Sequence, residues 1–183
     1  MKEDLSPRER ITRLLGGQAI DRPACVPLLL NHCARISGDT IGMYATDGAV
    51  MGKANIAAYR RYRQDLITIF TDTSIIAEAM GTTLHFPPDD VSRVARPAVG
   101  PDGLTDRLAA VDAKASGRLG VILEAVRRCV SEVGDEVFVS CCIPAPFSTV
   151  AALRGTAIFA RDLYKEPALA EALLDRAAEV TTE

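Results

Sequence analysis

The sequence predicts an α/β fold: the N-terminal part of a TIM (β/α)8 barrel with parallel strands and an N-terminal helical extension. Helical and apolar strand patterns alternate along the 183 residues, which is typical of parallel strands joined by helical crossovers. Only three strands are predicted, and the last predicted element is a helix. A closed barrel of this kind normally needs about 250 residues. We therefore expect residues 1–183 to form a single domain that is one part of a larger barrel, whose remainder has been removed or is supplied by a partner.

The first helix is predicted by the residues at its two ends. Ser6 can cap it, Pro7 occupies its first position and Glu9 completes a capping box. Gly16 and Gly17 follow its last apolar residue, and glycine is the usual residue just past the end of a helix.

The strands are predicted from uninterrupted apolar runs, because the strands of a parallel sheet are buried on both faces. These runs are residues 25–30, 66–72 and 136–142. The Gly-rich residues 36–53 are expected to form a loop. Residues 82–103, rich in Pro, Gly and Asp, are expected to form a long connection with short extended pieces. Helices are expected at residues 54–65, 73–81, 113–134, 148–155, 156–167 and 166–183.

Composition and charge exclude several classes of protein. The net charge is −3 and no basic stripe with interleaved aromatic residues occurs, so no nucleic-acid partner is expected. No apolar run reaches the roughly 20 residues of a membrane span, and the charged N-terminus is unlike a signal peptide. The five cysteines are odd in number and lack CxxC spacing. We expect reduced, mostly buried thiols and a cytoplasmic location.

Polar residues follow the predicted strands at the ends where parallel α/β folds place their sites. Asp72 ends the second strand, and Asn31, His32 and Arg35 follow the first. A different interpretation of Asp72 is local, because Asp-Thr-Ser is a good helix start and the carboxylate can cap the segment that follows.

Four segments in order resemble the uroporphyrinogen decarboxylase superfamily. They are RERITRLLGGQAIDRPACVPLL, FTDTSIIAEAMGTTLHF, CIPAPFSTVAALRG and DLYKEPALAEALLDRAAE. The resemblance implies a barrel that works beside a tetrapyrrole, with one of two chemistries. Decarboxylases remove acetate carboxyls from uroporphyrinogen III without a cofactor, and relatives transfer methyl groups between corrinoid proteins and thiols such as coenzyme M, using zinc.

The resemblance places Asp72 at the position of the aspartate that hydrogen-bonds the pyrrole N–H groups, and so implies a catalytic role. A carboxylate can accept several converging N–H bonds and can stabilise the positive charge of a protonated pyrrole. Glu78 could act as a base or support such a group, although a surface acid is an equally good interpretation. The substrate-binding residues implied by the resemblance are Asn31, His32, Arg35, Glu78 and Phe147.

The sequence differs from the decarboxylase pattern at the arginines that bind the carboxylates of the substrate. Asn31 replaces the first of two arginines, and only the second remains, as Arg35. Ala151 and Ala152 stand in the region that carries a tyrosine in the decarboxylase. Asn cannot pair with a carboxylate as an ion, whereas Arg does so bidentately. These departures favour the methyltransferase-like branch, with uroporphyrinogen III decarboxylase as the alternative.

The methyltransferase branch also implies cofactors and partners. Its zinc ligands, a His-x-Cys pair and a later Cys, lie in the second half of the barrel, so no metal site is expected in these residues. Zinc and a corrinoid are expected for a full-length homologue. The cluster at residues 60–63 could dock an acidic corrinoid protein. A third hypothesis is a non-catalytic half-barrel that binds a tetrapyrrole or a partner chain; its open sheet edges predict association, for example as a homodimer.

Overall fold

The chain forms two compact units. This computed structural model describes residues 4–182 other than Leu104, Asp106, Arg107 and Ala113. The first unit comprises Met1–Thr71 and Val121–Cys142, and the second comprises Asp72–Gly120 and Ile143–Glu183. The prediction of one domain over residues 1–183 stays a prediction, because compactness alone does not define a domain.

A pair of parallel strands lies in the first unit. Strand β1 (Leu66–Ile69) pairs with β4 (Phe138–Cys141) in parallel, with Leu66 opposite Phe138 and Ile69 opposite Cys141. The Cys142 N–H then donates to the Ile69 carbonyl at 3.0 Å. Two of the three predicted strands are therefore confirmed, as is their parallel direction.

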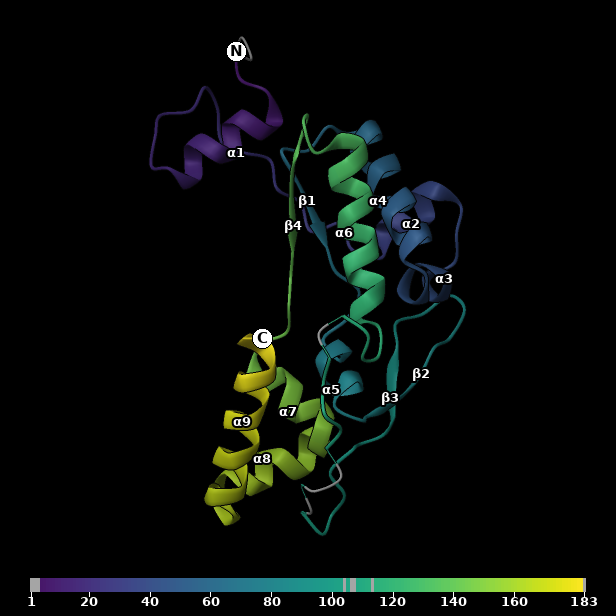
Figure 1. The fold of residues 1–183 in the computed structure, drawn as a ribbon, viewed down its shortest axis with the longest axis vertical. Helices are drawn as coiled ribbons and strands as arrows, with labels where there is room; N and C mark the ends of the chain where they lie inside the picture. Colours follow the sequence, from purple (N-terminus) through teal and green to yellow (C-terminus); the bar gives the residue numbers. More distant parts are fainter. Residues whose placement is uncertain (1–3, 104, 106–107, 113, 183) are drawn as a thin grey trace. The chain divides into compact units, whose positions relative to one another are not determined.

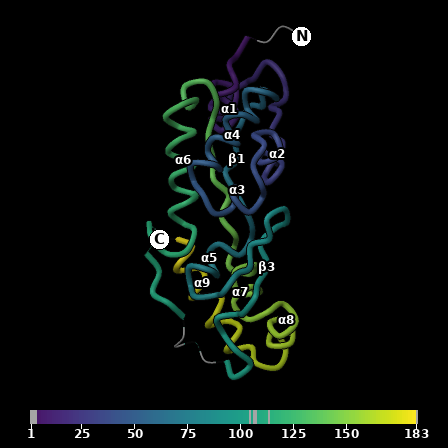
Figure 2. Tube along the Cα trace, turned by 90° about the vertical axis from the view of Figure 1, so that its right-hand side faces the viewer, coloured from purple at the N-terminus to yellow at the C-terminus, as the bar shows by residue number. Residues whose placement is uncertain are grey.

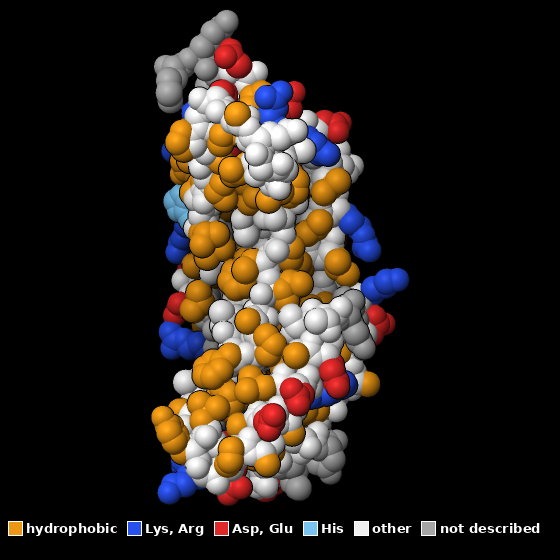
Figure 3. Space-filling view, turned by 90° about the vertical axis from the view of Figure 1, so that its left-hand side faces the viewer, with side chains coloured by type: hydrophobic (Ala, Val, Ile, Leu, Met, Phe, Trp, Pro, Cys, Tyr) orange, Lys and Arg blue, Asp and Glu red, His pale blue; other side chains and the backbone are white. Residues whose placement is uncertain are grey.

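Helices cover one side of this strand pair. Helices α2 (His32–Ser37), α3 (Ile41–Thr46), α4 (Gly48–Tyr62) and α6 (Leu119–Val133) lie on the same side of β1 and β4 in Figure 1. The tube in Figure 2 follows the same helices from another direction. Figure 3 looks onto the opposite face of the first unit, where hydrophobic side chains gather. The exposed apolar residues of this unit include Val26 and Leu28.

The predicted first helix is confirmed as α1 (Pro7–Leu15). The Ser6 side chain accepts from the Glu9 N–H, and the Glu9 carboxylate accepts from the Ser6 N–H. A buried ion-pair network attaches the helix to the rest of its unit. The fully buried Arg10 contacts Asp21 at 2.7 Å and Asp65 at 2.5 Å.

The predicted strand at residues 25–30 does not form. Pro23 and Pro27 lack N–H donors, and proline is excluded from central strands for that reason. The run makes one ladder-like bond, from the Asp65 N–H to the Cys25 carbonyl, and it turns where the Leu29 N–H reaches the Pro27 carbonyl. Leu30 then has a φ of +48°, which no strand residue adopts.

The predicted loop at residues 36–53 is also wrong, because most of it is helical. Thr40 caps α3 by accepting from the Met43 N–H, and Asp47 caps α4 by accepting from the Val50 N–H. These caps satisfy the free donors at each helix start, and they outweigh the low helix propensity of the glycines in this stretch.

The second unit is mainly helical. A short helix, α5 (Ile75–Ala79), leads into an antiparallel hairpin of β2 (Thr83–His85) and β3 (Arg93–Arg96). The hairpin confirms that residues 82–103 contain extended pieces. Helices α7 (Pro146–Arg154), α8 (Thr156–Lys165) and α9 (Pro167–Thr182) complete the unit, as predicted. Its core consists of Val99, Val150, Phe159, Ala170, Leu173 and Ala177.

The helix predicted at residues 113–134 begins later than expected, at Leu119; its predicted first residue, Ala113, lies outside the described residues. Residues 115–118 form turns instead, and these turns carry Arg118, which is described below.

All five cysteines are free thiols. The prediction that most are buried is wrong, since only Cys33 and Cys129 are buried. Cys25, Cys141 and Cys142 are exposed. No helix in the described ranges has the length and hydropathy needed to cross a membrane.

Candidate active site

The candidate site lies in the second unit and is centred on Asp72. The Asp72 Oδ1 atom accepts from the Ser74 N–H at 2.9 Å, a local turn of the kind that Asp favours. Ser74 is the N-cap of α5 but makes no side-chain capping bond of its own. Asp72 therefore makes a local turn just before α5, but it is not the N-cap of that helix, and the turn engages one of its two carboxylate oxygens.

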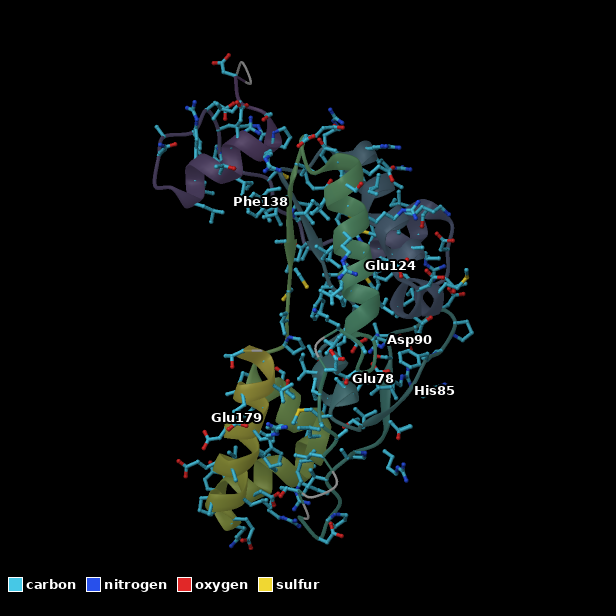
Figure 4. All side chains as sticks on the ribbon, in the orientation of Figure 1. Glu78, His85, Asp90, Glu124, Phe138 and Glu179 are labelled. Carbon is cyan, nitrogen blue, oxygen red and sulfur yellow. The ribbon has the colours of Figure 1, made fainter. Side chains whose placement is uncertain are left out.

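Arg118 joins Asp72 to Glu78. Its Nη1 atom lies 2.8 Å from Asp72 Oδ2, and its Nε atom lies 2.7 Å from Glu78 Oε2. The three side chains are 6%, 11% and 18% exposed for Arg118, Asp72 and Glu78 respectively. Figure 4 labels Glu78 on α5. A guanidinium shared by two carboxylates at hydrogen-bond distance forms charge-assisted bonds, which are stronger than neutral ones.

The backbone beside Arg118 approaches α5 closely. Gly117 has a φ of +52°, and a Cβ atom at this position would lie 3.1 Å from the Ala79 nitrogen. Glycine is therefore favoured at position 117 for two reasons: other residues rarely adopt this φ, and a side chain would crowd the backbone of α5. On its other side, the Arg118 guanidinium carbon lies 4.7 Å from the centre of the half-buried Phe86 ring, a distance at which a cation is attracted to an aromatic face.

This environment keeps the carboxylate charged. Burial alone would raise the pKa of Asp72, but the hydrogen bond and charge of Arg118 and the Ser74 N–H hold that pKa below its ordinary value. The pKa of Arg118 is raised, because Asp72 and Glu78 more than offset its burial. The site therefore offers a neutralised, ordered carboxylate.

A hollow of about 310 Å³ begins at the residues that follow Asp72. Hydroxyl groups of Thr73, Ser74, Ser148 and Thr156 are among its lining, together with small side chains at Ala151, Ala152 and Gly155. The two alanines are those that stand where the decarboxylase carries a tyrosine. Hydroxyls both donate and accept hydrogen bonds, so the hollow suits a small polar group.

Three further predicted site residues lie at or in α2, in the first unit. Asn31 is the N-cap of α2. His32 lies 3.0 Å from the Tyr62 hydroxyl through Nε2 and stacks on that ring. Arg35 is exposed in the last turn of α2. Because Asp72 belongs to the second unit, the predicted grouping of Arg35 with Asp72 around one ligand stays a prediction.

Phe147 lies in the first turn of α7, in the second unit. Its side chain is 57% exposed, and its ring centre lies 5.0 Å from that of Phe159. An aromatic ring held by the core on one side and open on the other can contact a ligand, which agrees with the predicted substrate-binding role without testing it.

Sequence reasoning missed Arg118. It lies 46 positions from Asp72, in a segment that was predicted to be helical. The available signal was the sequence Ser-Gly-Arg before the apolar stripe of α6, because glycine before a helix marks a turn that can present a long side chain.

Across the described ranges, no three His, Cys, Asp or Glu side chains converge in a way that could hold a metal ion. The expectation that the zinc ligands of the methyltransferase branch lie in the second half of the barrel stays a prediction.

An α/β chain with a parallel strand pair and a shielded, ionised carboxylate just beyond a strand belongs to the class of proteins that place their sites at strand ends. Within that class, the chain belongs to the uroporphyrinogen decarboxylase family: the family model described as Uroporphyrinogen decarboxylase (URO-D) matches residues 6–183. A comparison with curated proteins finds no match.

A solved structure shares the fold. The structure of a methyltransferase from Methanosarcina mazei superposes with a TM-score of 0.84 and 21% sequence identity. The match covers 97% of this chain and 53% of the other, so the chain spans about half the length of that protein. At this identity the likeness concerns the fold.

Proposed function

We propose that this chain is the N-terminal part of a (β/α)8 barrel that transfers a methyl group between a corrinoid and a thiol or similar acceptor. Family membership and the methyltransferase fold neighbour support this branch. The absence of one expected arginine, at Asn31, supports it as well. Cytoplasmic location remains part of the proposal.

The observation that carries the proposal is the engagement of both Asp72 oxygens. The Ser74 N–H uses Oδ1, and Arg118 uses Oδ2 and neutralises the charge. In the decarboxylase the corresponding carboxylate must receive converging pyrrole N–H donors, with which a guanidinium at 2.8 Å competes. A corrinoid presents no such donors, because its ring nitrogens are bound to cobalt. An already neutralised carboxylate therefore suits a corrinoid better than a porphyrinogen.

The residues of this chain would contribute binding and orientation. Corrinoids carry amide side chains at their periphery, and these both donate and accept hydrogen bonds. Glu78 and the hollow lined by Thr73, Ser74, Ser148 and Thr156 supply acceptors and donors at one end of the site, and Asp72 holds Arg118 in place beside them. The exposed Phe147 ring supplies an apolar contact. Zinc, which activates the thiol in this branch, is assigned to no residue of this chain.

Two other functions remain as alternatives. Uroporphyrinogen III decarboxylase activity would use Asp72 as the pyrrole-binding carboxylate and requires no metal. A non-catalytic half-barrel that binds a tetrapyrrole or a partner chain is favoured by the apolar face of the first unit (Figure 3), since large exposed apolar surfaces mark interaction sites.

Ligand binding and turnover distinguish these functions. Methylcobalamin is titrated into the chain, with binding followed by its absorbance, for the native protein, Asp72→Asn and the matched control Asp90→Asn, which alters an exposed aspartate of the hairpin. The proposal expects binding that Asp72→Asn weakens about tenfold or more, because the charge-assisted contact that orders Arg118 and Glu78 is lost. Asp90→Asn should leave the binding unchanged.

Activity is measured on the protein that contains this chain, supplied with zinc. Demethylation of methylcobalamin by coenzyme M supports the proposal. Conversion of uroporphyrinogen III to coproporphyrinogen without metal supports the decarboxylase instead. Binding of methylcobalamin without either reaction supports the non-catalytic alternative.

A further inference from the structure

A groove of about 550 Å³ lies between α4 and α6 in the first unit. It shares no residue with the Asp72 site, and the proposed function gives it no role. Its lining holds four cations, Lys53, Arg60, Arg61 and Arg128, and a single carboxylate, Glu132. We call it the basic groove. The whole chain carries a net charge of −3, so this concentration of positive charge contrasts with the rest of the protein.

The cations are only partly neutralised. Arg60 lies 3.1 Å from Glu132, and Arg128 shares the same carboxylate at 4.0 Å. Lys53 lies 3.3 Å from Asp39, a partly buried carboxylate outside the groove lining. The Arg61 guanidinium carbon lies 5.7 Å from the centre of the Tyr62 ring. Arg61 forms no ion pair with any described residue. Exposed pairs of this kind are worth little, so an incoming carboxylate can replace or join them at low cost.

Two glycines of α4 bring α6 close and help to order the groove. A Cβ atom at Gly48 would lie 2.7 Å from the Glu124 Cβ, and Figure 4 labels Glu124 on α6. A Cβ atom at Gly52 would lie 2.8 Å from the Arg128 Cδ, so the stem of Arg128 lies directly on the glycine. This contact restricts Arg128 and lowers the entropy that it loses when it binds a partner.

We propose that the basic groove is a docking surface for an acidic segment of a partner protein. Lys53 and Arg61 are eight positions apart on α4, about 12 Å along the helix axis. A single small anion cannot reach both, whereas a chain with several carboxylates can.

The floor of the groove favours a polypeptide over other polyanions. Its lining includes the half-buried Ala57 and the edge of the largely buried Ile56, which give side chains between the acidic residues an apolar surface to contact. None of the described residues that line the groove is aromatic, and single-stranded nucleic acids rely on aromatic platforms for base stacking. Polyphosphate could use the cations but not the apolar floor.

The test measures binding of defined polyanions to the chain at low and high salt. The probes are poly-L-glutamate, a peptide with glutamates and leucines at helical spacing, and inorganic polyphosphate. We expect the leucine-containing peptide to bind most tightly. We also expect its affinity to fall as salt rises, because exposed charges are screened within about 10 Å at 0.1 M ionic strength.

A charge-reversal variant locates the binding. Arg60→Glu, Arg61→Glu and Arg128→Glu together should weaken peptide binding at least about tenfold, since three attractive contacts become repulsive. The matched control, Arg13→Glu, Lys165→Glu and Arg176→Glu, makes the same change in net charge at helix positions outside the groove, of which Arg13 and Lys165 are exposed and Arg176 is half-buried. It should keep the affinity within about twofold. The single variant Arg61→Glu changes a side chain that forms no ion pair among the described residues, so it should fold normally. It should also weaken peptide binding, and it keeps the test valid if the triple variant misfolds.

Three results would overturn the proposal. In one, no acidic probe binds. In another, polyphosphate binds better than the leucine-containing peptide. In the last, the control triple variant weakens binding as much as the groove variant, which would mean that only the net charge matters.

Discussion

Arg118 Nη1 and Asp72 Oδ2 lie 2.8 Å apart, and both side chains are almost entirely removed from solvent. The same guanidinium reaches Glu78 at 2.7 Å. Buried charges are tolerated only when they are paired and hydrogen-bonded. The candidate site therefore depends on an arginine from the turn before α6, which fixes both the position and the charge state of the carboxylate.

Removal of Arg118 should destabilise the protein. In Arg118→Met, Asp72 and Glu78 would face each other as carboxylates without the cation between them, and the expected cost is about 3–5 kcal/mol of unfolding free energy. Urea unfolding measures it. The double variant Arg118→Met with Asp72→Asn should recover part of the loss, because one of the uncompensated charges is then gone. Equal stability of native protein and Arg118→Met would contradict the ion-pair network.

The contribution of Asp72 to stability should depend on pH. The pKa of Asp72 in the folded protein lies below the ordinary value of 3.8, so the unfolded chain takes up a proton first as the pH falls. The stability gained from ionised Asp72 is therefore full above that value and is lost as the pH falls through the lower folded pKa. The difference in unfolding free energy between native protein and Asp72→Asn should be constant near neutral pH and shrink below about pH 4. A difference that grows in acid would reverse the sign of this linkage.

Asp65 holds the N-terminal helix to the first strand. It is fully buried and contacts Arg10 at 2.5 Å, Arg22 at 2.6 Å and the Cys25 N–H at 2.6 Å. Asp65→Asn should cost about 3–5 kcal/mol, because Arg10 loses a buried partner.

The matched control for Asp65→Asn is Glu179→Gln, which breaks an exposed pair with Arg176 on α9. That change should cost no more than about 1 kcal/mol. Hydrogen exchange of the α1 amides adds a local measurement, since α1 should lose protection in Asp65→Asn alone. Comparable stability losses in the two variants would count against the buried network.

The sequence predicted correctly those helices whose end signals lie within a few residues of each other. The capping box of α1 involves residues three positions apart, and it forms as the sequence indicates. The strand prediction at residues 25–30 failed because hydrophobicity was weighed above the two prolines. Hydrophobic runs indicate burial, but a strand also needs donors, and Pro23 and Pro27 remove them.

Of the ion-paired residues in the candidate site, the sequence could place only Asp72 at a strand end. Asp72 follows an apolar run directly, and its local turn with Ser74 is readable from the sequence. Its ion partner comes from 46 positions away, and no periodicity or spacing rule relates two such residues. The sequence predicted Arg35 as the cation of the site, in the role of binding a carboxylate of the substrate, and it predicted no partner for Asp72 within the chain. In the structure Arg118 pairs with Asp72, and the close approach of Gly117 to α5 brings it there.

The two glycines of α4 should differ in their tolerance of a side chain. A Cβ atom at Gly48 would lie 2.7 Å from the Val121 carbonyl oxygen, which belongs to the backbone of α6 and can yield only if the helix moves. A Cβ atom at Gly52 meets the side chain of Arg128 instead, and a flexible side chain can shift. Alanine also favours a helix over glycine by about 1 kcal/mol, which offsets part of the strain in both variants. We expect Gly48→Ala to lose about 1–2 kcal/mol of unfolding free energy and Gly52→Ala to stay within about 1 kcal/mol of the native protein. Urea unfolding of both variants in one buffer makes the comparison, and a Gly52→Ala variant less stable than Gly48→Ala would show that the α4–α6 contact is not limited by the α6 backbone.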